Sequence, residues 1–224
     1  MTHPQIEPLY VFARWMLGSH EAAFEAMCMA IENAPGEDVM RQLSIMVAEL
    51  TATETTAKVD RFDELDDILR SDSTVPIDLE HPLVRGDARR LEVLLLELQR
   101  TCLMTALRNL PAGRRATFIL LYVMGLSLES VAAICETSVS ALRMLEIRGR
   151  RALEGYLTTR CEHLDPGNPC HCAPRLGGAL ERGFVTWPAH NDFAEAGAPE
   201  HYSEVKTLYA RLPRVRLPVF QPRP

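Results

Sequence analysis

Residues 126–157, LSLESVAAICETSVSALRMLEIRGRRALEGYL, decide the fold of this chain. Ser127 and Ser138 are typical N-cap residues, and an apolar pattern of helical spacing follows each of them. The two helices predicted from this pattern, at about 128–135 and 138–157, are separated by a turn of only about three residues. Two short helices with so tight a turn, the second rich in arginine, are typical of a helix-turn-helix unit.

The second of these helices carries the candidate DNA-binding residues. In a helix-turn-helix unit, the N-terminal residues of the second helix face the base edges in the major groove. Serine hydroxyls and arginines there can bind bases or phosphates, and arginines further along can neutralise phosphates. The predicted set is Ser138, Ser140, Ala141, Arg143, Arg148, Arg150 and Arg151. The alternative is that the arginine-rich helix is simply a solvated face.

Apolar residues at helical spacing also predict helices on both sides of this unit. The chain has no useful stretch of period-2 alternation, and its aromatic content of 6% favours cores of Leu, Val, Ile, Met and Ala. We therefore predict an all-α fold. The expected helices lie at about 9–31, 37–58, 87–109, 114–124 and 201–211, with a short one at 63–70. Residues 173–200 are expected to be mostly loop, and Gly177-Gly178 an isolated loop pair.

The distribution of charge suggests how the chain is divided. The net charge of −6 equals the acidic excess of residues 51–88 alone, whereas residues 141–160 are locally basic. We predict two small helical domains, residues 1–50 and 89–160, joined by an acidic linker at 51–88. A loop-rich C-terminal tail, residues 161–224, would follow the second domain.

Several classes of protein are not expected from the sequence. It contains no P-loop, no dinucleotide-binding glycine pattern and no nucleophile elbow, so we predict neither an enzyme nor catalytic residues. It also lacks a signal peptide and an apolar run of membrane-spanning length, so we expect a cytoplasmic protein without a membrane partner. Thiols are kept reduced in that compartment. Cys28, Cys102 and Cys135 fall on apolar helical stripes and are predicted core residues.

A cluster of cysteine and histidine residues follows the helix-turn-helix unit, in the stretch CEHLDPGNPCHC at 161–172. Turns between its two ends could fold the ligands onto one ion. Zinc or another transition metal is the predicted cofactor, with His171 as a spare ligand. The predicted metal ligands are Cys161, His163, Cys170 and Cys172. A redox sensor, and a loop whose surface thiols bind nothing, are the alternatives.

Residues 102–157 resemble region 4 of the extracytoplasmic-function (ECF) sigma factors of bacterial RNA polymerase, most clearly over ALRNLPAGRRATFILLYVMGLSLESVAAICETSVSALRMLEIRGRRALEGYL at 106–157. The shared features are AL-x-x-LP, an arginine soon after, a long apolar helix, GLS, a second serine and R-x-R-R-x-L at the end. The resemblance implies a domain that reads the −35 promoter element. The family usually has glycine in the turn, where this chain has Glu136.

The resemblance extends to both flanks. LYVFARWMLGSHEAAFEAM, at 9–27, looks like the first helices of sigma region 2, which bind the clamp of core polymerase. This region 2 would be degenerate, because its acids are thinned to Glu21 and Glu25 and residues 31–50 contain no aromatic. A helical pair for dimerisation or a regulatory partner is the alternative. Some ECF sigma factors carry a tail similar to 161–172, which suggests metal binding or redox sensing.

Together these features predict a transcription initiation factor of the ECF sigma type. Its partners would be core RNA polymerase, promoter DNA and an anti-sigma or other regulatory protein, and its activity would respond to metal or redox state. One alternative is a sigma-derived regulator that binds DNA or protein without initiating transcription. Another is a metal-dependent interaction protein whose helix-turn-helix packs against a protein.

Overall fold

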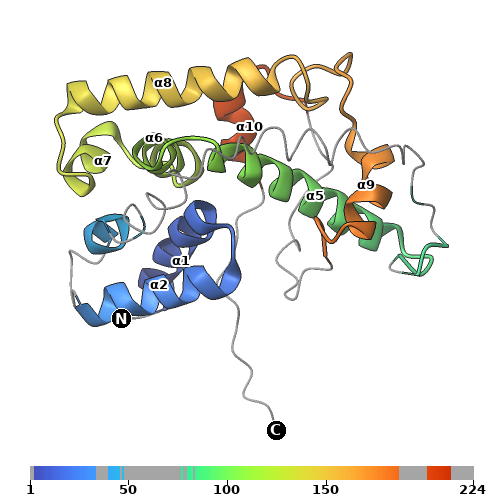
Figure 1. The fold of residues 1–224 in the computed structure, drawn as a ribbon, viewed down its shortest axis with the longest axis horizontal. Helices are drawn as coiled ribbons and strands as arrows, with labels where there is room; N and C mark the ends of the chain where they lie inside the picture. The colour runs from blue at the N-terminus through green and yellow to red at the C-terminus, as the bar shows by residue number, and fades with distance from the viewer. Residues whose placement is uncertain are drawn as a thin grey trace, which may run out of the picture.

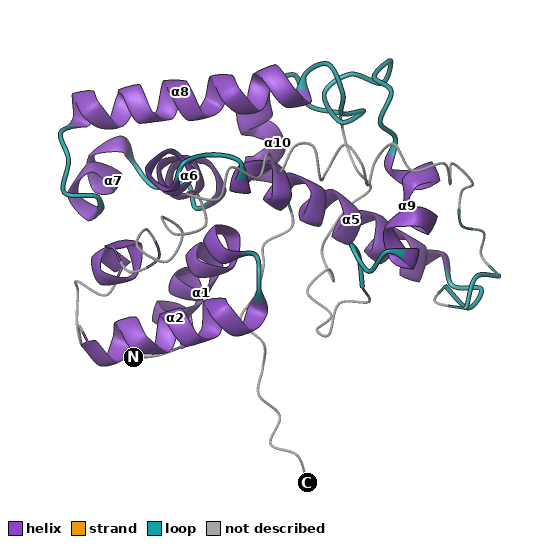
Figure 2. Ribbon diagram, in the orientation of Figure 1, coloured by secondary structure: helices purple, strands orange, loops and turns teal. Residues whose placement is uncertain are grey.

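The computed structural model describes residues 3–33, 40–45, 47, 77, 80–82, 84–186 and 201–212. Throughout this part of the chain the regular secondary structure is helical, without a strand (Figure 1, Figure 2). The predicted all-α class is therefore confirmed. Among the described helices, none is both long and apolar enough to cross a membrane.

The N-terminal segment forms two helices that pack against each other, α1 (His3–Leu17) and α2 (His20–Asn33) (Figure 1). The prediction of one continuous helix at 9–31 was wrong. Gly18 has a φ of 78°, which ends α1 in the left-handed region. The Ser19 hydroxyl then accepts a hydrogen bond from the Ala22 N–H at 3.3 Å and starts α2.

The structure describes only part of the next two predicted helices, at 37–58 and 63–70. Residues 40–45 and 47 are helical, within the helix predicted at 37–58. Leu43 and Val47 are buried, so this stretch adds to the same core as α1 and α2. The remainder of 37–58 and the short helix predicted at 63–70 lie outside the described residues.

The middle of the chain follows the predicted order. Helix α5 (Ala88–Arg108) starts at Asp87, whose carboxylate accepts from the Arg89 N–H at 2.9 Å. After Pro111, α6 (Ala112–Phe118) continues into one π-helical turn, η1 (Ile119–Val123). Gly125 ends this helix with a φ of 71°. The helices predicted at 87–109 and 114–124 are therefore confirmed.

The helix-turn-helix consists of α7 (Leu128–Ile134) and α8 (Val139–Leu157). Ser127 and Ser138 cap them as predicted, because their hydroxyls accept from the backbone N–H groups of Ser130 at 3.1 Å and Ala141 at 3.2 Å. Both caps are local interactions that the sequence alone specifies.

The tail contains two further helices, α9 (Cys172–Glu181) and α10 (Val205–Arg211). The second confirms the helix predicted at 201–211, but the prediction of a loop was wrong over 173–181. Gly177 and Gly178 lie inside α9, although glycine costs about 1 kcal/mol in a helix interior. Burial of Leu176 and Ala179 in a cluster with two leucines of α5 offsets that cost.

One hydrophobic core joins the N-terminal helices to the helix-turn-helix. Buried residues of α1, α2, α5, α6, η1, α7, α8 and α10 belong to it. It therefore includes residues from both predicted domains, 1–50 and 89–160, whereas residues 51–76 of the predicted linker lie outside the described part. The division into two domains stays a prediction.

Two buried side chains from outside α1 help to connect it to the rest of this core. The guanidinium of Arg115, with 1% of the residue exposed, donates to the carbonyl oxygens of Met16 at 2.8 Å, Arg108 at 2.8 Å and Leu110 at 3.2 Å. A cation is favourable there because α1 and α5 end at these carbonyls. Arg115 therefore holds the end of α1 against the end of α5.

Tyr209 of α10 is the second connection. Its ring contacts Phe118 and Trp15 in edge-to-face geometry, with centroid distances of 5.0 Å and 6.2 Å. Its hydroxyl donates to the carbonyl oxygen of Leu103 at 2.7 Å. Tyr209 thus contacts α1, α5 and α6 from a helix near the other end of the chain.

The turn between α7 and α8 contains a non-glycine residue in the left-handed region, Glu136, with a φ of 47°. This conformation costs an L-residue about 1–2 kcal/mol. The N–H of the next residue, Thr137, donates to the Ala132 carbonyl at 3.0 Å, so the turn is fixed by its hydrogen bonds. Glu136 also forms an exposed ion pair with Arg41 from the N-terminal segment.

We expect Glu136→Gly to be more stable than Glu136→Ala by about 1 kcal/mol, because only glycine relieves the left-handed strain. Both variants lose the ion pair with Arg41, so the comparison isolates the backbone effect. Urea unfolding monitored by circular dichroism measures the difference. An alanine variant as stable as the glycine variant would contradict the conformation of this turn.

Candidate DNA-binding helix and Cys/His site

Helix α8 lies along one side of the molecule, with α6 and α7 between it and α1 (Figure 1). Its inward face is formed by Leu142, Gly149, Leu153, Tyr156 and Leu157, which are buried. A Cβ on Gly149 would lie 3.4 Å from the backbone oxygen of Arg114, so glycine permits the close approach of α8 to α6. The opposite face of α8 is not covered by the described part of the chain.

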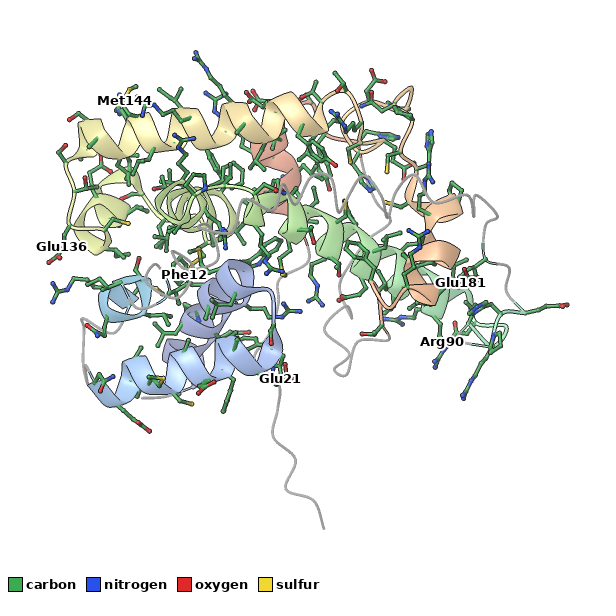
Figure 3. The ribbon with its side chains drawn as sticks, in the orientation of Figure 1. Phe12, Glu21, Arg90, Glu136, Met144 and Glu181 are labelled. Atoms are coloured by element: carbon green, nitrogen blue, oxygen red, sulfur yellow. The ribbon has the colours of Figure 1, made fainter. Side chains whose placement is uncertain are left out.

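Most of the predicted DNA-binding residues lie on this outer face. The exposed ones are Ser138, Ser140, Ala141, Arg143, Arg148 and Arg151. Between them lies Met144, which is 49% exposed and points away from the core (Figure 3). Sequence reasoning missed Met144, although an apolar residue on an otherwise polar face was the available signal. Such a side chain can contact the methyl group of thymine.

Arg150 differs from the other predicted residues because two carboxylates already bind it. Its guanidinium donates to Glu146 and to Glu154, each at 2.8 Å. The hydroxyl of Tyr122 donates to the same Glu146 at 2.6 Å. These bonds hold the guanidinium along the helix and neutralise its charge, so Arg150 is a weaker candidate for phosphate binding than Arg143, Arg148 or Arg151.

Residues 100–153 match the model of the family Sigma-70, region 4. This segment is therefore similar to region 4, and we use that name for residues 100–153. The match runs from the second half of α5 through most of α8, and it includes Arg115 and the exposed arginines up to Arg151. Region 4 is a DNA-binding transcription-factor domain that works with RNA polymerase, and it is not catalytic. No curated protein matches the chain.

Beyond region 4, the loop between α8 and α9 is folded back by its own side chains. The Asp165 carboxylate accepts from the Gly167 N–H at 2.8 Å, which forms a tight turn. The Asn168 amide donates to the carbonyl oxygens of Thr158 at 2.8 Å and Cys161 at 3.0 Å. Residues 161–163 are therefore held beside residues 170–172, and a backbone bridge pairs Cys161 with Cys170.

Three side chains of this loop have converging ligand atoms. Those of Glu162, His163 and Cys172 all lie within 4.8 Å of one another, and Cys172 Sγ is 3.4 Å from His163 Nε2. His163 and Cys172 belong to the predicted ligand set. Glu162 does not, although a carboxylate directly between two predicted ligands was a usable signal. Cys161 and Cys170 are not in the converging group.

Glu162 is held in place from two sides. Its carboxylate accepts from the Cys172 N–H, at the start of α9, at 2.5 Å and pairs with His171 Nδ1 at 2.8 Å. Burial raises the pKa of Glu162, but these hydrogen bonds outweigh burial and leave the pKa below its usual value. The group therefore offers an ionised carboxylate, an imidazole and a thiol, which is a donor set that Zn²⁺ accepts.

The pKa values of the thiols around this group are raised instead of lowered. Burial raises the pKa of Cys161 to about 11, and it raises the pKa values of Cys172 and Cys102 well above the usual range. Neighbouring thiols add to the effect, which shows that Cys102 of α5, predicted as a core residue, lies near the other three cysteines. Redox-sensing thiols have lowered pKa values, so the raised pKa values of these buried thiols do not support redox sensing.

Proposed function

We propose that the chain is a transcription initiation factor of the ECF sigma type. The observation that carries this proposal is the region 4 match at residues 100–153, whose second helix presents Arg143, Arg148 and Arg151 on an exposed face. Through this face α8 would bind the major groove of promoter DNA, and its arginines would bind phosphates and base edges. The proposed activity takes place in the cytoplasm.

The surface proposed to bind core polymerase is the outer face of α2. Glu21, Glu25, Met29 and Glu32 recur at helical spacing and are all exposed. They form an acidic stripe with one apolar side chain, and Glu21 lies at the edge of the molecule (Figure 3). Such a stripe would complement a basic surface on its partner. An anti-sigma or other regulatory protein could bind the same stripe.

A sigma-derived regulator that does not initiate transcription is the second candidate. Residues 31–50 contain no aromatic side chain with which to hold unpaired bases. In addition, the described helices α1 and α2 share one core with region 4 and are not separated from it in this conformation. In that case the chain would bind DNA, or a protein partner, without opening the promoter.

A reconstitution distinguishes the two candidates. The full chain is mixed with core RNA polymerase from its own source, and co-elution and promoter-dependent transcription from genomic fragments are measured. Co-elution with specific transcripts supports the sigma factor. DNA binding that persists without either result supports the regulator, whereas salt-insensitive failure to bind any DNA supports a protein-interaction role for the helix-turn-helix.

Within the same assay, we expect Arg143→Ala to weaken binding to a selected promoter fragment by about 5-fold to 150-fold, which corresponds to about 1–3 kcal/mol. Arg150→Ala is the matched control on the same helix, and it should change affinity less than Arg143→Ala because Glu146 and Glu154 already neutralise its charge. Fluorescence anisotropy at several salt concentrations measures both. Equal losses for the two variants would contradict the assignment of the outer face.

A further inference from the structure

The converging group at the start of the tail is connected to the C-terminal helix. The Tyr202 N–H donates to the carbonyl oxygen of His163 at 2.7 Å. His201 Nδ1 is bonded to the carbonyl oxygen of Glu162 at 2.9 Å. Two of the three converging residues thus hold, by their backbone, the segment that leads into α10.

Helix α10 in turn contacts both α1 and region 4. Its buried residues, Val205, Leu208 and Tyr209, belong to the main core. Tyr209 contacts Trp15 of α1 on one side and Phe118 of region 4 on the other. With seven residues, α10 is too short to be stable by itself, so its position depends on the contacts that anchor it.

We propose that Glu162, His163 and Cys172 bind a Zn²⁺-like transition-metal ion, and that this ion holds α10 docked across α1 and region 4. The metal site would be a latch between the tail and the closed arrangement of the N-terminal helices. Loss of the ion would loosen α1 and α2 from region 4. Only the effect of this change on transcription rests on the proposed function.

The three residues suit such an ion because they come from parts of the chain that are already fixed. His163 is 3% exposed, and its loop is held by the bonds of Asp165 and Asn168. Cys172 is the first residue of α9, which is anchored on α5 by the cluster around Leu176. The fourth position of a tetrahedral ion falls to water or to a neighbouring thiol.

The coupling to α10 follows from the same contacts. An ion bound by the side chains of Glu162 and His163 fixes the peptide units whose oxygens bind residues 201 and 202. Without the ion, local opening of the loop removes both anchors together. Because coupling is reciprocal, undocking of α10 must also weaken metal binding.

The test uses the full chain carrying Trp187→Phe, which leaves Trp15 as the single tryptophan of the two in the sequence. The protein is stripped with a chelator and titrated with zinc chloride. Bound zinc is measured by plasma mass spectrometry, Trp15 by its emission maximum, and residues 205–212 by hydrogen exchange. We expect about one ion per chain, a blue shift of Trp15 emission on binding, and about tenfold or greater slowing of exchange in α10.

Variants then assign the ligands. Cys172→Ser and His163→Gln should lose both the zinc and the protection of α10. Cys28→Ser, a partly buried cysteine on α2, is the matched control and should behave like the parent. The zinc-free and zinc-bound forms of the parent give the comparison even if a variant fails to fold.

Two results would overturn the proposal, namely a parent chain that binds no zinc and zinc binding that leaves the exchange of α10 unchanged. Neither measurement uses polymerase or DNA. A working latch combined with failed reconstitution would therefore count against the proposed function alone, and the reverse combination against the latch alone.

Discussion

Replacing Arg115 with alanine is expected to lower the free energy of unfolding by about 3 kcal/mol or more. The guanidinium is buried and donates to the carbonyl oxygens of Met16, Arg108 and Leu110. In the alanine variant these oxygens lose a charged donor at a place that water does not readily reach. A buried acceptor left without a partner costs about 1–3 kcal/mol, and here several are affected together.

Urea unfolding followed by circular dichroism measures this loss. Arg114→Ala is the control, since Arg114 is the adjacent residue, is only partly buried, and keeps in alanine the Cβ that packs near Gly149. It should cost less than about 1 kcal/mol. Arg115→Lys keeps the charge but not the forked donor geometry, and should lie between the two. A loss for Arg115→Ala no larger than that of the control would show that the connection between α1 and α5 has other causes.

The second large effect is expected for Tyr209→Ala, which should destabilise the protein by about 3–5 kcal/mol. The substitution removes a buried ring that fills the space between Trp15 and Phe118. It also removes the hydrogen bond to the Leu103 carbonyl. Because α10 contributes few other large side chains, we expect the helix to undock and α1 to loosen from region 4.

Tyr209→Phe separates the two contributions. It keeps the ring and loses only the hydroxyl, so it should cost about 0.5–1.5 kcal/mol for the lost hydrogen bond, because the Leu103 carbonyl lies inside α5 and keeps its helical hydrogen bond. Urea unfolding gives the free energies, and Trp15 emission in the Trp187→Phe background reports whether α1 has loosened. If Tyr209→Ala leaves that emission unchanged, then α10 does not hold α1 in place.

The elements that could be predicted from the sequence are those specified by neighbouring residues. Asp87, Ser127 and Ser138 each start a helix where an acceptor side chain precedes an apolar pattern. The exposed face of α8 follows from the same periodicity. The Cys/His loop was found because its residue types are concentrated within twelve positions, although the carboxylate of Glu162 was overlooked.

What could not be predicted depends on contacts between distant residues. The break between α1 and α2 is an exception, because Gly18 and Ser19 are local signals for it; it was missed because the apolar pattern of 9–31 continues across them. Helix α9 contains two glycines and is stabilised by packing on α5, which no local pattern encodes. The approach of Cys102 to the tail thiols, and the shared core, likewise arise from tertiary structure.

Arg115 and Tyr209 both donate their hydrogen bonds to main-chain oxygens. Arg115 binds the carbonyls of Met16, Arg108 and Leu110, and Tyr209 binds that of Leu103. A carbonyl is present whatever side chain the residue carries. In related chains, we therefore expect the residue type at the four acceptor positions to vary among residues of suitable size and polarity. The arginine and the tyrosine should be kept or lost together with the closed arrangement itself.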